Sequence, residues 1–389
     1  MTISPPAGVG GRPLIGSGSY LPEDVTFLLT DLSAANLERP TEDREEGFQS
    51  GRHYSEDLPI EYQPDAAYLE IYQQALERSA RRVALATGIV AELVRHTKPA
   101  PVLASIARAG TPIGILMRRW YLFRHGLDVP HYAISVIKDR GVDLNALRYI
   151  TDRHPAAAVQ FVDGWTGKGV MTRVLAEAVR GLGLDDTLAV LADPARCVSL
   201  FGTRDDFLIP SACLNSTVSG LVSRTVLNAD HIGPDDFHGA KFYGELTGHD
   251  LSRHFVDTIV SRFDEVADEV DREWPRLWAA DRTPTWEGWA AVERIAARFD
   301  IPDVIMVKPG VGEATRVLLR RVPWRILVAP DRVDELAHVL ALAEARGVPV
   351  EEMEGLPFSC VGLVRPVRSE AEGAPVFHTP AARWRPVAP

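Results

Sequence analysis

Short apolar runs alternate with helix-spaced apolar patterns over the first half of the chain. The expected helices cover 64–96 (as one long helix or two short ones), 112–123 and 171–182, and the expected strands cover 101–106, 131–137 and 157–162. Strands that alternate with helices predict βαβ units, so we expect a parallel sheet that helices cover on both faces. Residues 190–255 show mixed loops and short elements without a clear period.

The pattern changes beyond residue 258. Residues 258–289 are helical, acidic and rich in tryptophan, with a break at Asp281–Pro284. A second, smaller α/β pattern follows, with strands at 304–307, 324–328, 348–351 and 360–364 and helices at 313–319 and 331–345. We therefore expect a flexible tail at 1–19, a main domain at 20–285, a small α/β domain at 286–368 and a disordered tail at 369–389.

Composition places the chain among soluble globular proteins. Its 389 residues are 46% hydrophobic and 24% charged. Cys197, Cys213 and Cys360 are far apart, so we expect neither a disulfide framework nor a zinc site, and a reducing cytoplasm is the expected location. No stretch approaches the roughly 20 apolar residues of a membrane span, so we expect no membrane partner. The net charge of −11 argues against general polyanion binding but leaves room for a local basic patch.

Two glycine-bearing loops follow predicted strands of the main domain. One runs from Asp163 to Gly169, and the other runs from Ser105 to Thr111 and contains Arg108. Glycine lets a backbone approach phosphate closely, and free N–H groups at a helix start bind the oxygens. For each loop alone the alternative is an ordinary strand-to-helix turn or a solvated arginine. A Walker A loop is not supported, because no GK[ST] follows the glycines.

Taken together, the two loops resemble those of type I phosphoribosyltransferases. Residues 161–169 look like the ribose-5-phosphate loop of that family, and residues 107–111 look like its pyrophosphate loop. The resemblance implies a ribose-5-phosphate site made of Asp163, Gly164, Trp165, Thr166, Gly167, Lys168 and Gly169. It implies a pyrophosphate site made of Ser105, Ala107, Arg108, Ala109 and Gly110. Mg²⁺ would be held through the pyrophosphate, with Asp163 as a candidate protein ligand.

Longer segments resemble the StiP-like proteins of tellurite-resistance-type gene clusters. These segments are 26–31, 53–56, the two loops and 206–217, and the resemblance spans most of 20–365. It implies a phosphoribosyltransferase-like α/β fold followed by a Pelota-like RNA-binding domain. Some proteins of this group carry the label of cysteine protease.

Further polar residues complete the expected site. Lys138 and Arg140 follow the strand at 131–137, where they would clamp a pyrophosphate leaving group unless they form a solvated turn. The base would be recognised by His53, Tyr54, Cys213 and Asn215. The alternative for the segment around Cys213 is a structural buried loop. Cys213 is also a candidate cysteine nucleophile, since four histidines lie downstream of it.

The small domain carries its own candidate site. Lys308, Gly310, Glu313 and Arg316 form a basic, glycine-rich strand-to-helix turn. It resembles the RNA-contacting turn of the Pelota and kink-turn-binding ribosomal protein family, and backbone phosphates are its expected target. The alternative is an interaction or dimerisation module.

The combined prediction is a phosphoribosyltransferase that uses 5-phosphoribosyl-1-pyrophosphate and Mg²⁺. Asp163, Arg108, Lys138 and Arg140 would be its catalytic residues, and the acceptor would be an unknown base or small molecule. RNA is the expected partner of the small domain, and a homodimer is possible. The alternatives are a donor-sensing RNA-binding regulator and a cysteine peptidase that uses Cys213.

Overall fold

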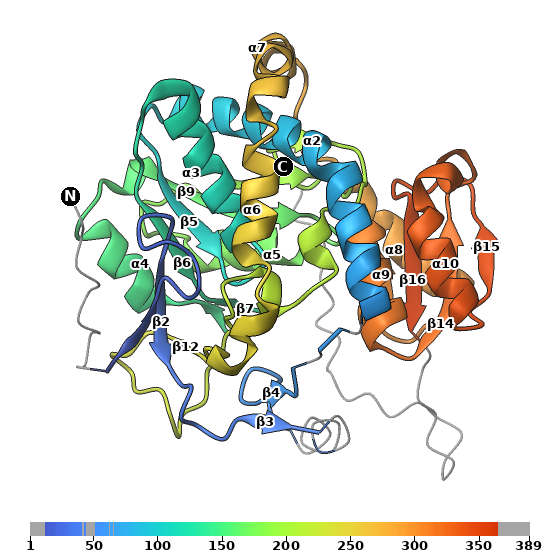
Figure 1. The fold of residues 1–389 in the computed structure, drawn as a ribbon, viewed down its shortest axis with the longest axis horizontal. Coiled ribbons are helices and arrows are strands. Elements are labelled where there is room, and N and C mark those ends of the chain that lie inside the picture. Colours follow the sequence, from blue (N-terminus) through green and yellow to red (C-terminus); the bar gives the residue numbers. More distant parts are fainter. Residues whose placement is uncertain (1–11, 41–42, 44–50, 62, 65, 365–389) are drawn as a thin grey trace.

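The computed structural model describes residues 12–40, 43, 51–61, 63–64 and 66–364 (Figure 1). The predicted tail at 369–389 and the first eleven residues of the predicted tail at 1–19 lie outside these residues. Within the N-terminal range, Leu14–Gly16 forms strand β1 and pairs with β2.

Eight strands of the described chain form one central sheet. They are β1, β2 (Thr26–Asp31), β5 (Val102–Ile106), β6 (His131–Ile134), β9 (Val159–Trp165), β10 (Leu188–Ala192), β11 (Leu200–Thr203) and β12 (Gly239–Ala240). The order is β1-β2-β6-β5-β9-β10-β11, with β12 beside β2. Every pairing except that of β1 with β2 is parallel. The expected parallel sheet is therefore confirmed.

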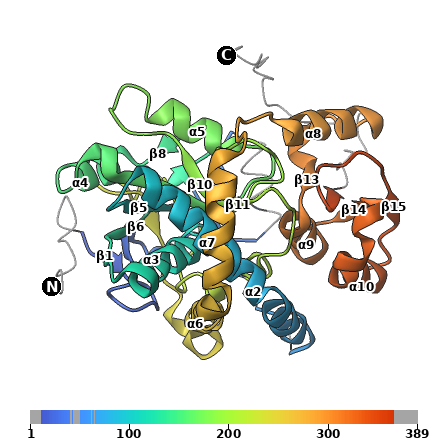
Figure 2. The same cartoon turned by 90° about the horizontal axis from the view of Figure 1, so that it is seen from above.

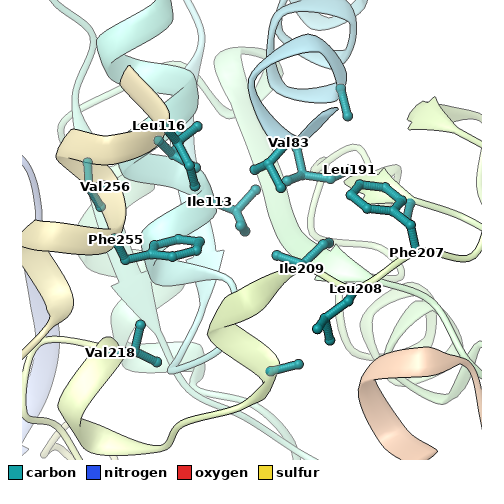
Figure 3. Close-up of a cluster of buried hydrophobic side chains, with 14 of the residues drawn as sticks. Val83, Ile113, Leu116, Leu191, Phe207, Leu208, Ile209, Val218, Phe255 and Val256 are labelled. Atoms are coloured by element: carbon teal, nitrogen blue, oxygen red, sulfur yellow. The ribbon is translucent and has the colours of Figure 1, made fainter. Parts of the chain in front are cut away.

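Helices cover both faces of this sheet, as Figures 1 and 2 show. The helices of the main domain are α2 (Ala66–Thr97), α3 (Thr111–His125), α4 (Leu144–Thr151), α5 (Val170–Ala178), α6 (Ser252–Val260) and α7 (Phe263–Ala279). Leu103 and Val162 pack in a cluster with α2, α3, α6 and α7, part of which Figure 3 shows. Their chain neighbours Ala104 and Phe161 pack in another cluster with α4 and α5. Neighbouring residues lie in different clusters because successive side chains of a strand point to opposite faces of the sheet.

The small domain packs a four-stranded sheet against helices. Its elements are α8 (Glu287–Arg298), β13 (Val307–Pro309), α9 (Val311–Arg320), β14 (Pro323–Val328), α10 (Ala337–Ala345), β15 (Val350–Glu352) and β16 (Cys360–Val364). The strand order is β13-β16-β14-β15. The expected small C-terminal α/β domain is therefore confirmed.

Short elements complete the description. They are the strand pairs β3 (Glu38–Arg39) with β4 (Leu58–Pro59) and β7 (Val136–Ile137) with β8 (Gly141–Val142), and the 3₁₀ turns η1 (Ala156–Ala158), η2 (Pro210–Ala212), η3 (Ser216–Val218), η4 (Gly244–His249), η5 (Val304–Met306) and η6 (Pro330–Leu336). Among the described helices, none combines the length and the apolar character needed to cross a membrane.

Three expectations about individual elements were wrong. Strand β9 continues through Trp165, because Asp163 and Trp165 pair with Val190 and Ala192 of β10. Strands β10 and β11 lie in the region expected to be irregular. The expected strand at 304–307 is instead the 3₁₀ turn η5, and its sheet pairing starts only at Val307.

Candidate functional site

A cavity of about 430 Å³ lies between the two domains, at the carboxyl ends of β5 and β9. We call it the interdomain cleft. Its polar lining comprises Arg108, Asp163, Asn215 and Arg224 from the main domain and Lys308, Glu313, Arg316 and Arg321 from the small domain. Five of these eight side chains are basic and two are acidic, so the cleft is cationic inside an acidic protein.

The structure brings the two predicted phosphate loops together. Strands β5 and β9 are adjacent, with Ser105 opposite Val162. A Cβ on Gly110 would lie 2.6 Å from the Val162 carbonyl oxygen, so this close approach of the backbones requires glycine.

The polar groups of the loop at 163–169 are engaged within the protein. Thr166 donates a 2.5 Å hydrogen bond from Oγ1 to the buried Asp193. Lys168 donates from Nζ to the carbonyl oxygen of Val304 in the small domain, and burial lowers the pKa of its ammonium group to about 7. A Cβ on Gly167 would meet Pro309 at 3.5 Å. This loop therefore serves as a contact between the domains.

The cations predicted to hold pyrophosphate are also paired. Arg108 donates to the Asn215 side chain (2.7 Å) and to the Val222 carbonyl (3.1 Å). Lys138 and Arg140 are half-exposed and lie beside Asp139 (3.6 Å) and Glu56 (3.1 Å). Ser105 is buried and bonded through Oγ to the His131 ring (2.7 Å).

The residues predicted to recognise a base are divided between two places. Tyr54 accepts a hydrogen bond at its hydroxyl from the Lys138 backbone N–H (2.9 Å), and the His53 ring bonds to Ser55 (2.8 Å). Cys213 and Asn215 lie elsewhere, in the segment that contains η2 and η3.

Two helical turns and their anchors fix the segment at 206–217. The Glu61 carboxylate accepts hydrogen bonds from the backbone N–H (2.8 Å) and hydroxyl (2.7 Å) of Ser216. Cys213 directly follows η2, and its carbonyl oxygen accepts a hydrogen bond from the Tyr68 hydroxyl. The side chain of Asn215 reaches the interdomain cleft. The segment therefore borders the cleft through Asn215, two residues after the buried Cys213.

The three cysteines differ in their surroundings. Burial and the neighbouring Asp193 raise the pKa of the Cys197 thiol to about 12. Burial and Asp206 raise the pKa of the Cys360 thiol well above its ordinary value. Both thiols are therefore held in the unreactive neutral form. Cys213 is 1% exposed, and the segment that contains it contributes the Asn215 side chain to the lining of the cleft.

Asp163 is the titratable acid of the cleft with the most perturbed pKa. Burial raises the pKa of its carboxyl to about 7, against the opposing effects of the Gly164 N–H and Arg316. Burial also opposes ionisation of Glu313, but Arg316 and Lys308 together hold the pKa of that carboxyl below its ordinary value. Asp163 can therefore exchange a proton near neutral pH, whereas Glu313 stays ionised.

The turn predicted to contact RNA faces the main domain. Lys308, Glu313 and Arg316 line the cleft, and the Arg316 guanidinium donates to the Ala212 carbonyl oxygen (3.2 Å). A Cβ on Gly310 would lie 3.3 Å from an Asp206 carboxylate oxygen. The turn is thus part of the domain contact.

Several positions at the cleft were not among the predicted site residues. Arg224 and Arg321 line the cleft, and Arg321 belongs to the basic stretch that follows the predicted RNA-contacting turn. Glu61 was missed because it lies 155 positions from its partner Ser216. In the part of the chain that the structure describes, no group of three or more His, Cys, Asp or Glu side chains is placed to hold a metal ion. The magnesium expectation stays a prediction.

Comparison with known proteins gives three matches. A family model described as "Tellurite-like stress resistance cysteine protease StiP" matches residues 18–260. A model described as "PELOTA RNA binding domain" matches residues 286–366. A protein named "Cysteine protease StiP", from Acinetobacter baylyi (strain ATCC 33305 / BD413 / ADP1), is 35% identical over 370 residues, which cover 90% of this chain and 94% of that protein.

These matches confirm the resemblance to StiP-like proteins and the Pelota-type domain, and they overturn the predicted activity. The prediction of a phosphoribosyltransferase was wrong, because both the family and the relative are named as cysteine protease. A type I phosphoribosyltransferase domain is not supported. The physical reason lies in the two loops. Arg108, Thr166 and Lys168, the side chains meant to hold phosphate, are already bonded to other parts of the protein.

Proposed function

Because this chain belongs to the StiP family, we propose that it is a cysteine peptidase with Cys213 as its nucleophile and an RNA-binding C-terminal domain. The observation that carries the assignment of Cys213 is its place in the chain, two residues before Asn215, which lines the cationic cleft. Cys197 and Cys360 are disfavoured by the raised pKa values of their thiols.

Positive charge beside the segment supports this assignment. Arg316 bonds to the backbone of Ala212 and Arg108 bonds to the side chain of Asn215, so guanidinium groups are anchored on both sides of Cys213 along the chain. Cations near a cysteine favour the thiolate, which is the nucleophilic form. This arrangement places two cations on the residues that flank Cys213.

Asp163 is the group that we assign to proton transfer. The cleft lining contains no histidine among the described residues, and one ring nitrogen of each of His53, His131 and His238 is bonded to a serine hydroxyl. With a pKa of about 7, the Asp163 carboxyl is partly protonated at neutral pH. It therefore has the acidity that a proton donor to a leaving amine requires.

The proposed reaction follows from these groups. The Cys213 thiolate attacks the peptide carbonyl carbon, a C–S bond forms, and the C–N bond breaks as Asp163 gives its proton to the amine. Water then attacks the thioester and the C–S bond breaks; the Asp163 carboxylate takes up one proton of the water, and the other proton passes to solvent. The products are a carboxylate, an amine and the regenerated thiolate.

A peptide-cleavage experiment tests the nucleophile. The full chain is incubated with a proteome-derived peptide library, and cleavage is measured by mass spectrometry. We expect Cys213→Ala to lose at least about 10³-fold in rate, because the covalent step disappears. Cys197→Ala is the matched control and retains activity. Equal cleavage by Cys213→Ala and the wild type would exclude this function.

The RNA-binding half of the proposal has its own support. The Pelota-type match covers 286–366, and Lys308, Arg316 and Arg321 of that domain gather at the cleft. Binding through phosphates weakens as salt rises. We expect bulk transfer RNA to bind the full chain with such a salt dependence. Lys308→Ala with Arg316→Ala should weaken this binding, and Arg346→Ala, which alters an exposed arginine of the same domain, should not.

A further inference from the structure

A shared core holds the two walls of the interdomain cleft together. Residues of α9 and of the segment at 206–217 belong to one buried cluster, namely Val311, Ala314, Leu318, Phe207, Leu208 and Ala212. The Asp206 carboxylate adds hydrogen bonds from the Val311 N–H (3.0 Å) and the Ser359 N–H (2.8 Å) of the small domain. The cleft is therefore a preformed cavity, and a ligand binds it without the cost of ordering its walls.

The protein balances only part of the positive charge in the cleft. Three of the five cations have an acidic neighbour, in the pairs Arg316–Glu313 (2.8 Å), Arg108–Glu61 (3.8 Å) and Arg224–Asp57 (3.6 Å). The side chains of Lys308 and Arg321 also line the cleft, and neither makes a hydrogen bond or ion pair with another residue of the described ranges. Lys308 and Arg321 are therefore the cations that a ligand can engage.

The two cations also repel each other. Lys308 is half-buried and Arg321 is exposed. Burial lowers the pKa of the Lys308 ammonium group, Glu313 opposes this effect, and Arg321 lowers the pKa further. An anion placed between the two cations would offset their repulsion and favour the charged form of Lys308. This part of the cleft therefore favours a ligand that carries a negative charge.

The rest of the lining suits a peptide better than a nucleic acid. Ile106, Val136, Met171 and Val317 supply aliphatic surface. Among the described residues no aromatic side chain lines the cleft, so a nucleobase would find no ring on which to stack. The volume of about 430 Å³ is that of a small-ligand pocket, which admits side chains but not a helix of RNA. An acidic side chain on a peptide with apolar neighbours fits these features.

We propose that the cleft selects peptide substrates with an acidic side chain, whose carboxylate binds between Lys308 and Arg321. The proposal rests on the peptidase function proposed above and names its class of substrate. Asp163, the group assigned to proton transfer, lines the same cleft, so the bound acid lies close to the bond that is cut. Lys308 and Arg321 are then specificity-determining residues and take no part in the chemical step.

Fluorescence anisotropy of a labelled peptide tests the proposal in the full chain. The probe is a short peptide of alternating glutamate and alanine, and its matched control has glutamine in place of each glutamate. Binding is measured with Cys213→Ala, so that the probe is not cut. Because the whole protein has a net charge of −11, an acidic peptide is repelled from most of its surface, and binding of the probe reports on the cationic cleft.

Two substitutions remove the selecting charges. Lys308→Met and Arg321→Gln, combined, keep long side chains in place and delete both cations. Arg346→Gln is the matched control, because Arg346 is an exposed arginine of the same domain whose bond to the Leu319 carbonyl lies within that domain. If circular dichroism shows that the combined variant is unfolded, Arg321→Gln alone decides, since its side chain is exposed.

We expect the glutamate probe to bind at least about tenfold more tightly than the glutamine probe, because a charge-assisted hydrogen bond is roughly twice as strong as a neutral one. The combined variant should reduce this preference to within about twofold, with a smaller reduction in Arg321→Gln alone, and Arg346→Gln should keep the full preference.

Equal binding of the two probes, or a preference that survives the loss of both charges, would overturn the acidic specificity. Loss of oligouridylate binding in the combined variant with an intact peptide preference would also overturn it, and would assign the two cations to RNA. The peptidase function fails separately: the wild type would then cleave no peptide, although Cys213→Ala still prefers the glutamate probe.

Discussion

The loop at 163–169 and the segment at 206–217 border the same part of the molecule and have opposite characters. The loop carries the stronger sequence motif, with three glycines and two hydroxyl or ammonium groups that suit a phosphate. In the structure Thr166 is bonded to Asp193, and Lys168 is bonded to Val304 of the small domain. The loop therefore has a structural role in the contact between the domains. The segment has no glycine-rich turn, yet it places Asn215 in the cleft, two residues after Cys213.

The difference shows what a glycine-rich turn does and does not reveal. Glycine stands at 167 and 169 where other chain segments approach the backbone closely. Pro309 lies near Gly167, and Trp286 lies near Gly169. A phosphate and a neighbouring domain impose the same demand on the backbone, so the motif alone cannot distinguish them. The bonding partners of the side chains do distinguish a phosphate site from a domain contact.

The largest expected effect comes from removing the Asp193 carboxylate, which holds the loop at 163–169 through Thr166. Asp193 is buried and accepts hydrogen bonds from Thr166, Arg204 and the Cys197 and Val198 N–H groups. Asp193→Ala leaves a partly buried arginine and several donors without their acceptor, so we expect a loss of about 3–5 kcal/mol in the free energy of unfolding. Urea denaturation measures it. The exposed Asp186→Ala is the control, and a loss below about 1 kcal/mol for Asp193→Ala would show that the loop is not structural.

A smaller effect is expected where the segment is anchored. Glu61 accepts both hydrogen bonds from Ser216 and lies 3.8 Å from Arg108. Glu61→Ala removes the anchor, and we expect a loss of about 2 kcal/mol in unfolding free energy. We also expect a lower kcat with little change in KM, because the nucleophile is less well positioned. The matched variant is Glu77→Ala on the exposed side of α2. Wild-type kcat in Glu61→Ala would remove the segment from the catalytic site.

The smallest effect concerns the charge of Asp163, and it depends on pH. Its folded pKa of about 7 lies above the unfolded value, so the wild type loses stability as pH rises from about 4 to 7. Asp163→Asn keeps the acceptor for the Gly164 N–H and cannot ionise. We therefore expect the stability of Asp163→Asn relative to the wild type to increase by up to about 2 kcal/mol over this range. Thermal unfolding at several pH values measures the difference. A constant difference would mean that Asp163 has an ordinary pKa and no role in proton transfer.

The sequence predicted local structure well and long-range pairing poorly. The strands at 102–106 and 360–364 and the helix at 66–97 are found close to their expected bounds, because their apolar periods are strong. Strand β10 was missed, since Leu188–Ala192 contains a single β-branched residue.

The site was harder to predict than the fold. The pairing of Lys168 with Val304 spans 136 positions, and that of Arg316 with Ala212 spans 104. No local pattern encodes such contacts, although they decide whether a cation is free to bind a ligand. The adjacency of the two glycine loops followed from strand order, but their chemistry did not.

The order of the elements along the chain gives the contact between the two domains a temporal consequence. Helix α9 is synthesised after every strand of the central sheet, so the emerging main domain can fold on the ribosome before the small domain exists. A nascent chain that has passed α7 therefore has Ala212 without its contact to α9. A chain cut in the stretch between α7 and α8 would stay permanently in that state. Complete translation, and not folding of the main domain, is then the event that completes the cleft between the domains.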